Sequence, residues 1–253
     1  MNDLAINIKT QAVEKGSLAV FFLGQAGFVF KTENGRLICI DPYLSDCCNR
    51  YFGFKRLMPR LIEADELSLD YLLVSHAHYD HFDPDSVPLL MANGKTRFIG
   101  ANDTKAECER LGIKDNLRFM SVGDCFEDEN IKVTAVPCDH GSETPFAVGF
   151  VLEVSGKRIY YMGDTAYRED WLGNPFIQNT DMLILPINGA FGNLNEREAA
   201  TVAARLNPGL AVPCHYWNFA EHGGNPMLFC DEMKKNAPDV RYMLMRQGEA
   251  III

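Results

Sequence analysis

The sequence predicts a fold that mixes β-strands with α-helices in a single domain, residues 1–253. Three observations support this prediction. Apolar runs of strand length, bounded by Gly, Pro, Asn and Asp, recur along the chain. Groups of these runs alternate with stretches that carry helix-capping signals. No low-complexity linker divides the 253 residues, and a chain of this length can bury one sizeable core.

The expected strands form two meanders. They cover residues 18–23, 28–32, 36–40, 72–75, 97–99, 117–121, 131–136, 146–154, 158–162, 181–187, 209–213, 240–245 and 250–253. Asn34-Gly35 joins one pair and Ser155-Gly156 another, because such pairs readily take the positive φ of a tight hairpin turn. Residues 1–17 give no clear pattern, and Gly123-Asp124 and an acidic turn separate the strands expected at 117–121 and 131–136.

Helices are expected from the cap at residues 83–86 to about residue 92, and at residues 103–111, 195–206 and 227–235. Asn195 with Glu198 three residues later makes a capping box for the third of them. Gly112 ends the second, because glycine takes the left-handed terminal conformation most easily. The order of strands and helices fits two mixed sheets packed face to face with helices outside.

The most informative stretch is the run at residues 72–81, Leu-Leu-Val-Ser-His-Ala-His-Tyr-Asp-His, in which a buried strand ends in three histidines and an aspartate. In an extended segment His76 and His78 point to the same side, so both imidazoles can bind one ion. Asp80 and His81 are adjacent and can serve one ion together only where the backbone turns. This pattern suits two neighbouring metal ions better than one.

Composition limits the partners. Hydrophobic residues make up 47% and charged residues 23%, as in ordinary globular proteins. The formal net charge is −10 and the pI is about 5.1, which disfavours nonspecific binding to nucleic acid or to anionic membranes. No apolar run reaches membrane-spanning length. We therefore expect no nucleic-acid partner and no integral membrane association.

The eight cysteines include no Cys-x-x-Cys pair, which argues against a zinc knuckle and against a thioredoxin-like motif. Residues 1–15 lack the pattern of a signal peptide. We expect a cytoplasmic protein with reduced thiols, several of them buried.

Residues 43–60 interleave aromatic residues with basic ones and show no helix or strand period. The segment reads as a long loop, with two alternatives for its role. It is either a solvated surface excursion or a flap over the metal site that selects an anionic substrate. In the second case Arg50, Lys55 and Arg56 are candidate anion contacts.

The string His76-Ala77-His78-Tyr79-Asp80-His81 resembles the His-x-His-x-Asp-His signature of the metallo-β-lactamase superfamily, most of whose members are binuclear metallohydrolases. The resemblance implies an α+β fold, an αββα sandwich of two mixed sheets with helices on the outer faces. It extends from Leu23-Gly24-Gln25-Ala26-Gly27 to Gln247-Gly248-Glu249-Ala250.

Three later strands end in residues that can bind metals, His140, Asp164 and His215, although each alone could be a structural, surface or turn residue. The resemblance assigns the ligands, which are His76, His78 and His140 for one ion, Asp80, His81 and His215 for a second, and Asp164 between the two. Nitrogen and oxygen ligands suit two Zn²⁺ or Mn²⁺ ions, or Fe²⁺.

Two dications about 3.5 to 4 Å apart can activate a bridging water as a hydroxide nucleophile. Asp80 can orient that hydroxide. Asp41 ends a strand at the point where the superfamily places an aspartate, and it can hydrogen-bond a ligand or the water. His222 is a candidate proton donor or substrate contact.

Other residues are candidate substrate contacts, namely Tyr79, Asn188, Tyr216 and Trp217. For the three aromatic residues, packing in the core is the alternative.

Two branches of the superfamily are similar to this chain. Leu185-Pro186-Ile187-Asn188-Gly189 looks like the L-ascorbate 6-phosphate lactonase-like branch, and the stretch at residues 41–46 resembles N-acylphosphatidylethanolamine phospholipase D-like proteins. The first implies hydrolysis of a small anionic ester or lactone, and a homo-oligomer. The alternatives are a phosphodiesterase and a non-catalytic metal-binding or redox protein.

Overall fold

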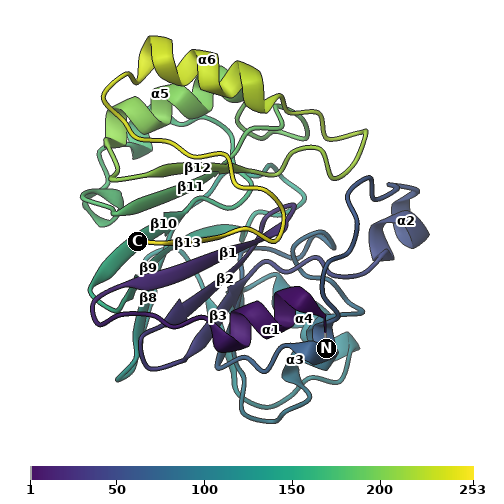
Figure 1. Cartoon of the computed structure of the whole chain (residues 1–253). Helices are drawn as coiled ribbons and strands as arrows, with labels where there is room; N and C mark the ends of the chain where they lie inside the picture. The colour runs from purple at the N-terminus through teal and green to yellow at the C-terminus, as the bar shows by residue number, and fades with distance from the viewer. Residues whose placement is uncertain (1) are drawn as a thin grey trace.

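The computed structural model describes residues 2–253, and within this range the strands form two mixed sheets that pack face to face (Figure 1). The first sheet contains, in spatial order, β13 (Ala250–Ile252), β1 (Leu18–Gly24), β2 (Gly27–Thr32), β3 (Leu37–Ile40), β4 (Tyr71–Val74), β5 (Arg97–Ala101) and β6 (Leu117–Met120). The second contains β12 (Ala211–Cys214), β11 (Met182–Pro186), β10 (Lys157–Tyr161), β9 (Val148–Val154), β8 (Ile131–Pro137) and β7 (Cys125–Glu127).

Helices cover the outer face of each sheet (Figure 1). The first sheet is covered by α1 (Asp3–Thr10), α3 (Val87–Met91) and α4 (Thr104–Arg110), and the second by α5 (Glu196–Leu206) and α6 (Pro226–Asn236). A further short helix, α2 (Cys47–Phe52), stands to the side of these layers. Three 3-10 helices cover Ala64–Glu66, Glu169–Trp171 and Pro175–Ile177. The predicted αββα sandwich is confirmed.

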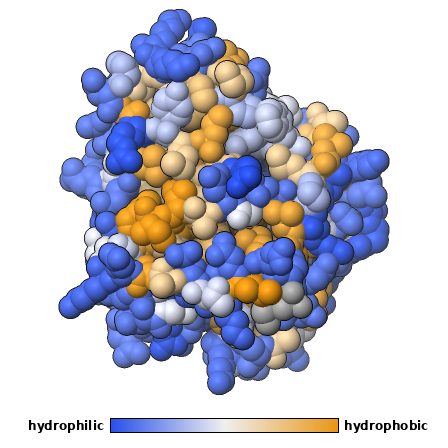
Figure 2. Space-filling model, in the orientation of Figure 1, coloured by the Kyte–Doolittle hydropathy of each residue, from blue (hydrophilic) through white to orange (hydrophobic). Residues whose placement is uncertain are grey.

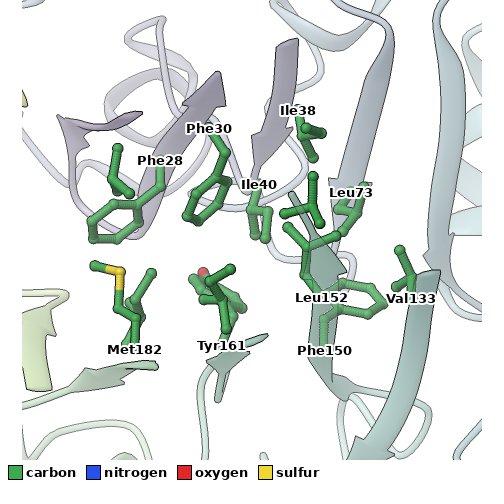
Figure 3. Packing of buried hydrophobic residues seen from close by; sticks show 14 of the residues in the cluster. Phe28, Phe30, Ile38, Ile40, Leu73, Val133, Phe150, Leu152, Tyr161 and Met182 are labelled. Carbon is green, nitrogen blue, oxygen red and sulfur yellow. The ribbon is translucent and has the colours of Figure 1, made fainter. Parts of the chain in front are cut away.

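The main core lies between the sheets and follows from the two-residue period of the strands. In β1, Leu18, Val20 and Phe22 face the second sheet, whereas Ala19 and Phe21 face the helices on the other side. Figure 3 shows aromatic and aliphatic side chains of the first sheet lying opposite those of the second. The facing residues are Phe28, Phe30, Ile38, Ile40 and Leu73 on one side and Val133, Phe150, Leu152, Tyr161 and Met182 on the other. Because β1 is buried on both faces, its sequence is a continuous apolar run.

The surface in the same orientation is hydrophilic over the helical layers at top and bottom (Figure 2). Apolar residues gather across the middle of this face, over the strands. None of the helices between residues 2 and 253 has the length and hydrophobicity needed to cross a membrane.

The structure corrects four of the expected elements. Residues 3–10, which gave no pattern, form α1, and residues 125–127, read as a turn, form β7. The long loop at 43–60 contains α2. The strand expected at 240–245 is wrong, because only the bridge between Ala211 and Tyr242 forms there.

Pro213 explains why the segment at 240–245 pairs with β12 only at this bridge and does not form a strand. Ala211 donates its N–H to the Arg241 carbonyl and accepts from the Met243 N–H. The next residue of β12 on the same side is Pro213, which has no N–H to continue the ladder.

Candidate metal centre and pocket

The candidate site lies where strands from both sheets end at a common edge. β3, β4 and β5 run parallel in the first sheet, as do β10, β11 and β12 in the second. His76 follows β4, Asp164 follows β10 and His215 follows β12 directly. The fold therefore brings side chains together that lie as far as 139 positions apart in the sequence.

The first group of candidate ligands contains His76, His78 and His140. Each offers one ring nitrogen, and these nitrogens lie within 4.8 Å of one another. Nε2 of His140 is 3.0 Å from Nδ1 of His78. Three imidazoles that converge in this way can bind one divalent ion.

The second group contains Asp80, His81, Asp164 and His215, whose ligand atoms also lie within 4.8 Å of one another. Nε2 of His215 is 3.0 Å from Oδ2 of Asp164 and 3.1 Å from Oδ2 of Asp80. Oδ2 of Asp164 also lies 3.7 Å from Nε2 of His140, a member of the first group. All seven residues that the sequence suggested as ligands are thus in one cluster, with Asp164 between its halves.

The donor atoms fit divalent ions. Nε2 of His76 and Oδ1 of Asp164 are buried and have no hydrogen-bond partner among the described residues. Such orphaned polar atoms are rare, and a bound cation would satisfy their lone pairs. The two thiols that neighbour ligands in the sequence have other surroundings: Sγ of Cys138 contacts the Asp164 carbonyl, and Cys214 belongs to the core between the sheets.

The charges of the cluster also favour cations. Burial alone would raise the pKa values of Asp80 and Asp164, but the neighbouring His81 and His215 hold both pKa values well below their usual range. Burial opposes charge on His81, yet Asp164, Asp80 and Asp41 raise its pKa well above the usual value. At neutral pH the two carboxylates are therefore ionised and available as ligands.

Asp41 is fully buried directly behind the ligands, and its φ is +44°. Its carboxylate accepts hydrogen bonds from the Ser75 N–H (2.7 Å), the Ser75 hydroxyl (2.5 Å) and the Tyr161 hydroxyl (2.7 Å). It also lies 2.7 Å from Nδ1 of His81. A carboxylate on one nitrogen of a histidine fixes the ring so that the other nitrogen, here Nε2, faces the ion.

His222 lies beside the second group of ligands. Its ring stacks on that of His215, with centroids 4.7 Å apart and planes 5° apart. Nε2 of Gln25 is 3.1 Å from Nδ1 of His222 and 2.8 Å from Oδ2 of Asp80. Gln25 therefore links His222 to a candidate ligand.

Sequence reasoning missed Gln25. It is buried, and its φ is +53° in the turn between β1 and β2. The available signal was a polar side chain placed between two runs that are otherwise apolar.

A cavity of about 240 Å³ opens over the ligands. Beyond the ligand residues, its lining is mostly aromatic and comprises Cys48, Phe52, Phe54, Tyr79, Glu143, Phe191 and His222. Tyr79 is thus in the pocket, as suggested. Tyr216 packs in the core beneath α5 and α6 instead, Trp217 is exposed, and Asn188 binds Asn193 and the Ala190 carbonyl.

The basic residues of the 43–60 segment do not line the pocket. Arg50 binds the carboxylate of Asp85 at 2.8 and 2.9 Å. Arg56 is nearly buried, donates to the carbonyls of Tyr43 and Ser45, and lies 4.2 Å over the Tyr43 ring. Lys55 is exposed. The segment does border the site, but it presents aromatic side chains to it rather than cations.

Comparison with known proteins places the chain among metal-dependent enzymes. Residues 36–216 match the family described as the Beta-lactamase superfamily domain. A UPF0173 metal-dependent hydrolase of Methanopyrus kandleri is 27% identical over 92% of this chain and 99% of its own. A UPF0173 metal-dependent hydrolase of Cupriavidus taiwanensis is 30% identical over 88% and 82%, respectively. The solved structure of Igni18, a metallo hydrolase from Ignicoccus hospitalis, aligns with a TM-score of 0.73 at 20% identity, over 94% of this chain and 98% of that one.

Proposed function

Because this chain belongs to the metallo-β-lactamase superfamily, among the UPF0173 metal-dependent hydrolases, we propose that it cleaves a small ester or lactone with the help of two divalent ions, zinc or manganese. The observation that carries the proposal is the position of Asp164 between two neighbouring ligand groups. Two divalent ions bound there would polarise a substrate oxygen and activate water near neutral pH. His76, His78 and His140 would hold one ion, and Asp80, His81 and His215 the other.

The other polar residues of the site have distinct roles in this proposal. Asp80, whose free side faces the pocket, orients the attacking water. Asp41 keeps His81 in its ligand orientation through the bond to Nδ1. Burial and the neighbouring His215 lower the pKa of His222 to about 4, so its ring is neutral at pH 7. With the Gln25 amide nitrogen directed at Nδ1 of His222, the single proton of the neutral ring would lie on Nε2, from which it can donate a hydrogen bond to a leaving oxygen.

Replacing His222 with leucine, whose side chain has no hydrogen-bond donor, tests that last role. We expect kcat/KM to fall by about 10²-fold for alkyl esters, because a hydrogen bond from Nε2 stabilises the charge that develops on a poor leaving group, and by less than about tenfold for p-nitrophenyl esters, whose leaving group carries that charge readily. The measurement is the slope of log kcat/KM against leaving-group pKa, together with the metal content. An equal loss across the series would instead make His222 a support for His215, on which it stacks.

A phosphodiesterase is the alternative, since the same ligands would serve attack at phosphorus. A phosphodiester carries a permanent negative charge, as does the anionic ester that the sequence suggested. Among the described residues, no lysine or arginine lines the pocket to meet such a charge. The charge of either substrate would therefore have to be met by the ions themselves.

Metal removal and return test the proposed function. We expect elemental analysis to give two ions per chain, chelation to abolish turnover of aryl esters and lactones, and Zn²⁺ or Mn²⁺ to restore it. The free energy of unfolding should also fall on chelation, because ligand binding to the native state stabilises it.

The substrate panel includes bis(p-nitrophenyl) phosphate. Turnover confined to that compound would favour the phosphodiesterase. No turnover of any compound with both ions bound would favour the non-catalytic alternative.

A further inference from the structure

The pocket wall above the ligands is a continuous row of aromatic rings. Tyr79 and Phe52 have ring centroids 5.7 Å apart, Phe52 and Phe54 6.3 Å, and Phe54 and Phe191 5.9 Å. The Phe191 ring in turn lies 5.3 Å from that of His222. These rings come from α2 and the turn after it, from the metal-binding motif and from the loop after β11, and we call them the aromatic wall.

The aromatic wall leaves much apolar surface open to solvent. Phe52 is 57% exposed and Phe191 58% exposed. Two large exposed aromatic side chains at the mouth of a cavity are typical of a ligand-binding surface. Their contacts with neighbouring rings leave more than half of each side chain uncovered.

The backbone at Phe191 supports the same conclusion. Its φ is +54°, which is rare for a bulky residue and costs about 1 to 3 kcal/mol. The loop is held in this form by the Gly189 N–H, which donates to the Leu194 carbonyl at 2.9 Å, and by Asn193, which donates to the Asn188 side chain at 3.1 Å. The loop thus maintains an unfavourable backbone conformation that directs the Phe191 ring toward the cavity.

The charges around the pocket disfavour an anion. Among the described residues that line it, the only charged side chain outside the candidate ligands is that of Glu143, an exposed carboxylate. Of the three basic residues that the sequence suggested, Arg50 binds Asp85 and Arg56 binds backbone carbonyls, while Lys55 is exposed and does not line the pocket. A negatively charged group on the wall side would meet Glu143, and no lysine or arginine among the described pocket-lining residues would compensate its charge.

The cavity also limits size. An apolar cavity of about 150 Å³ accepts benzene, and the cavity here measures about 240 Å³. It can therefore take one six-membered ring together with an ester or lactone group at the ligands.

Three observations support one inference: the aromatic wall, the strained loop at Phe191, and the absence of lysine and arginine from the described pocket lining. We propose that the substrate is an uncharged aryl ester or aryl-fused lactone whose flat ring lies against Phe52, Phe54 and Phe191. This inference rests on the proposed hydrolase function. In the reaction, water adds to the carbonyl carbon and the bond from that carbon to the aryl oxygen breaks. The aryl oxygen leaves with a proton, and a carboxylic acid remains.

Matched substrates test the inference in the metal-loaded protein. We expect kcat/KM for 3-carbamoylphenyl acetate to exceed that for 3-carboxyphenyl acetate by at least about tenfold, because the two differ mainly in charge. Glu143→Gln should narrow that ratio. Phe191→Ala should lower kcat/KM for the neutral ester by about tenfold, mainly through KM. Phe176→Ala, which removes a similarly exposed ring outside the pocket, should change nothing.

A binding measurement decides the inference independently of turnover. Acetanilide, the amide analogue of phenyl acetate, should bind to the metal-loaded protein at least about tenfold more tightly than 3-acetamidobenzoate, and Phe191→Ala should weaken its binding by a similar factor. Equal binding of the two compounds, or equal behaviour of Phe191→Ala and Phe176→Ala, would overturn the inference. Turnover of charged and aliphatic esters as fast as aryl esters would also overturn it while leaving the proposed function intact. Loss of all turnover with acetanilide still bound would remove the proposed function alone.

Discussion

Replacing Asp164 with alanine is expected to remove at least one of two bound ions and to lower kcat/KM by about 10³-fold or more. The reason is that the Asp164 carboxylate reaches both ligand groups, at 3.0 Å from Nε2 of His215 and 3.7 Å from Nε2 of His140. Metal ions contribute several kcal/mol to stabilising charge in the transition state, and each 1.36 kcal/mol is a factor of ten in rate. The measurement is metal content per chain by elemental analysis, with kcat/KM on the same samples.

Two variants control this result. Asp164→Asn keeps the shape of the side chain but loses its charge, so its metal content should lie between those of the wild type and the alanine variant. Asp231→Ala removes an exposed carboxylate on α6, far from the site, and should leave metal content and rate unchanged. Two ions and full activity in Asp164→Ala would contradict a bridging role.

Replacing Asp41 with alanine is expected to lower the free energy of unfolding by about 3 to 5 kcal/mol, even without metal. The change removes the acceptor of the Ser75 N–H and one partner each of the Ser75 and Tyr161 hydroxyls, in a site with no exposure to water. The Tyr161 hydroxyl keeps the Ala26 carbonyl at 3.1 Å, and the Ser75 hydroxyl keeps Nδ1 of His76 at 3.0 Å. The change also frees the His81 ring, so metal affinity should fall by about 10- to 100-fold. Chemical denaturation of the chelated protein measures the first effect, and metal titration of the folded variant measures the second.

Asp41→Asn separates these two effects. It keeps one acceptor oxygen for the Ser75 groups, but its amide cannot accept from both Tyr161 and His81. We expect a smaller loss of stability than in the alanine variant and a comparable loss of metal affinity. If Asp41→Ala unfolds at the same denaturant concentration as the wild type, the four contacts at Asp41 have no net stabilising effect.

Much of the fold was predictable because its signals are local. Ser155-Gly156 adopts the positive φ values of a tight turn, at +51° and +72°. In the capping box, the Asn195 side chain accepts from the Glu198 N–H at 3.0 Å, and the Glu198 carboxylate accepts from the Asn195 N–H at 3.0 Å. α1 was not predictable, because it is short and its Leu4, Ala5 and Ile8 are fixed by packing against the first sheet.

Some residues of the candidate site were also predictable from the sequence, and others were not. The ligand pattern was predictable because His76 and His78 follow a buried strand and are two residues apart, so that both imidazoles point to the same side. Gln25 and Phe191 were not, since each depends on a positive φ at a non-glycine residue. The prediction that Arg50 contacts an anionic substrate was not supported. Its partner, Asp85, lies 35 positions away, and the sequence alone does not show that the two side chains meet.

Because α2 lies beside the layers and not within them, this segment can change without disturbing the fold, which bears on how substrate specificity can evolve. The segment that carries Phe52 and Phe54 supplies no strand to either sheet and none of the candidate metal ligands. Exchanging it for a segment of different length would change which molecules can enter the cavity, while the candidate metal ligands stay in place. Directed evolution toward new substrates should therefore accumulate its changes here first.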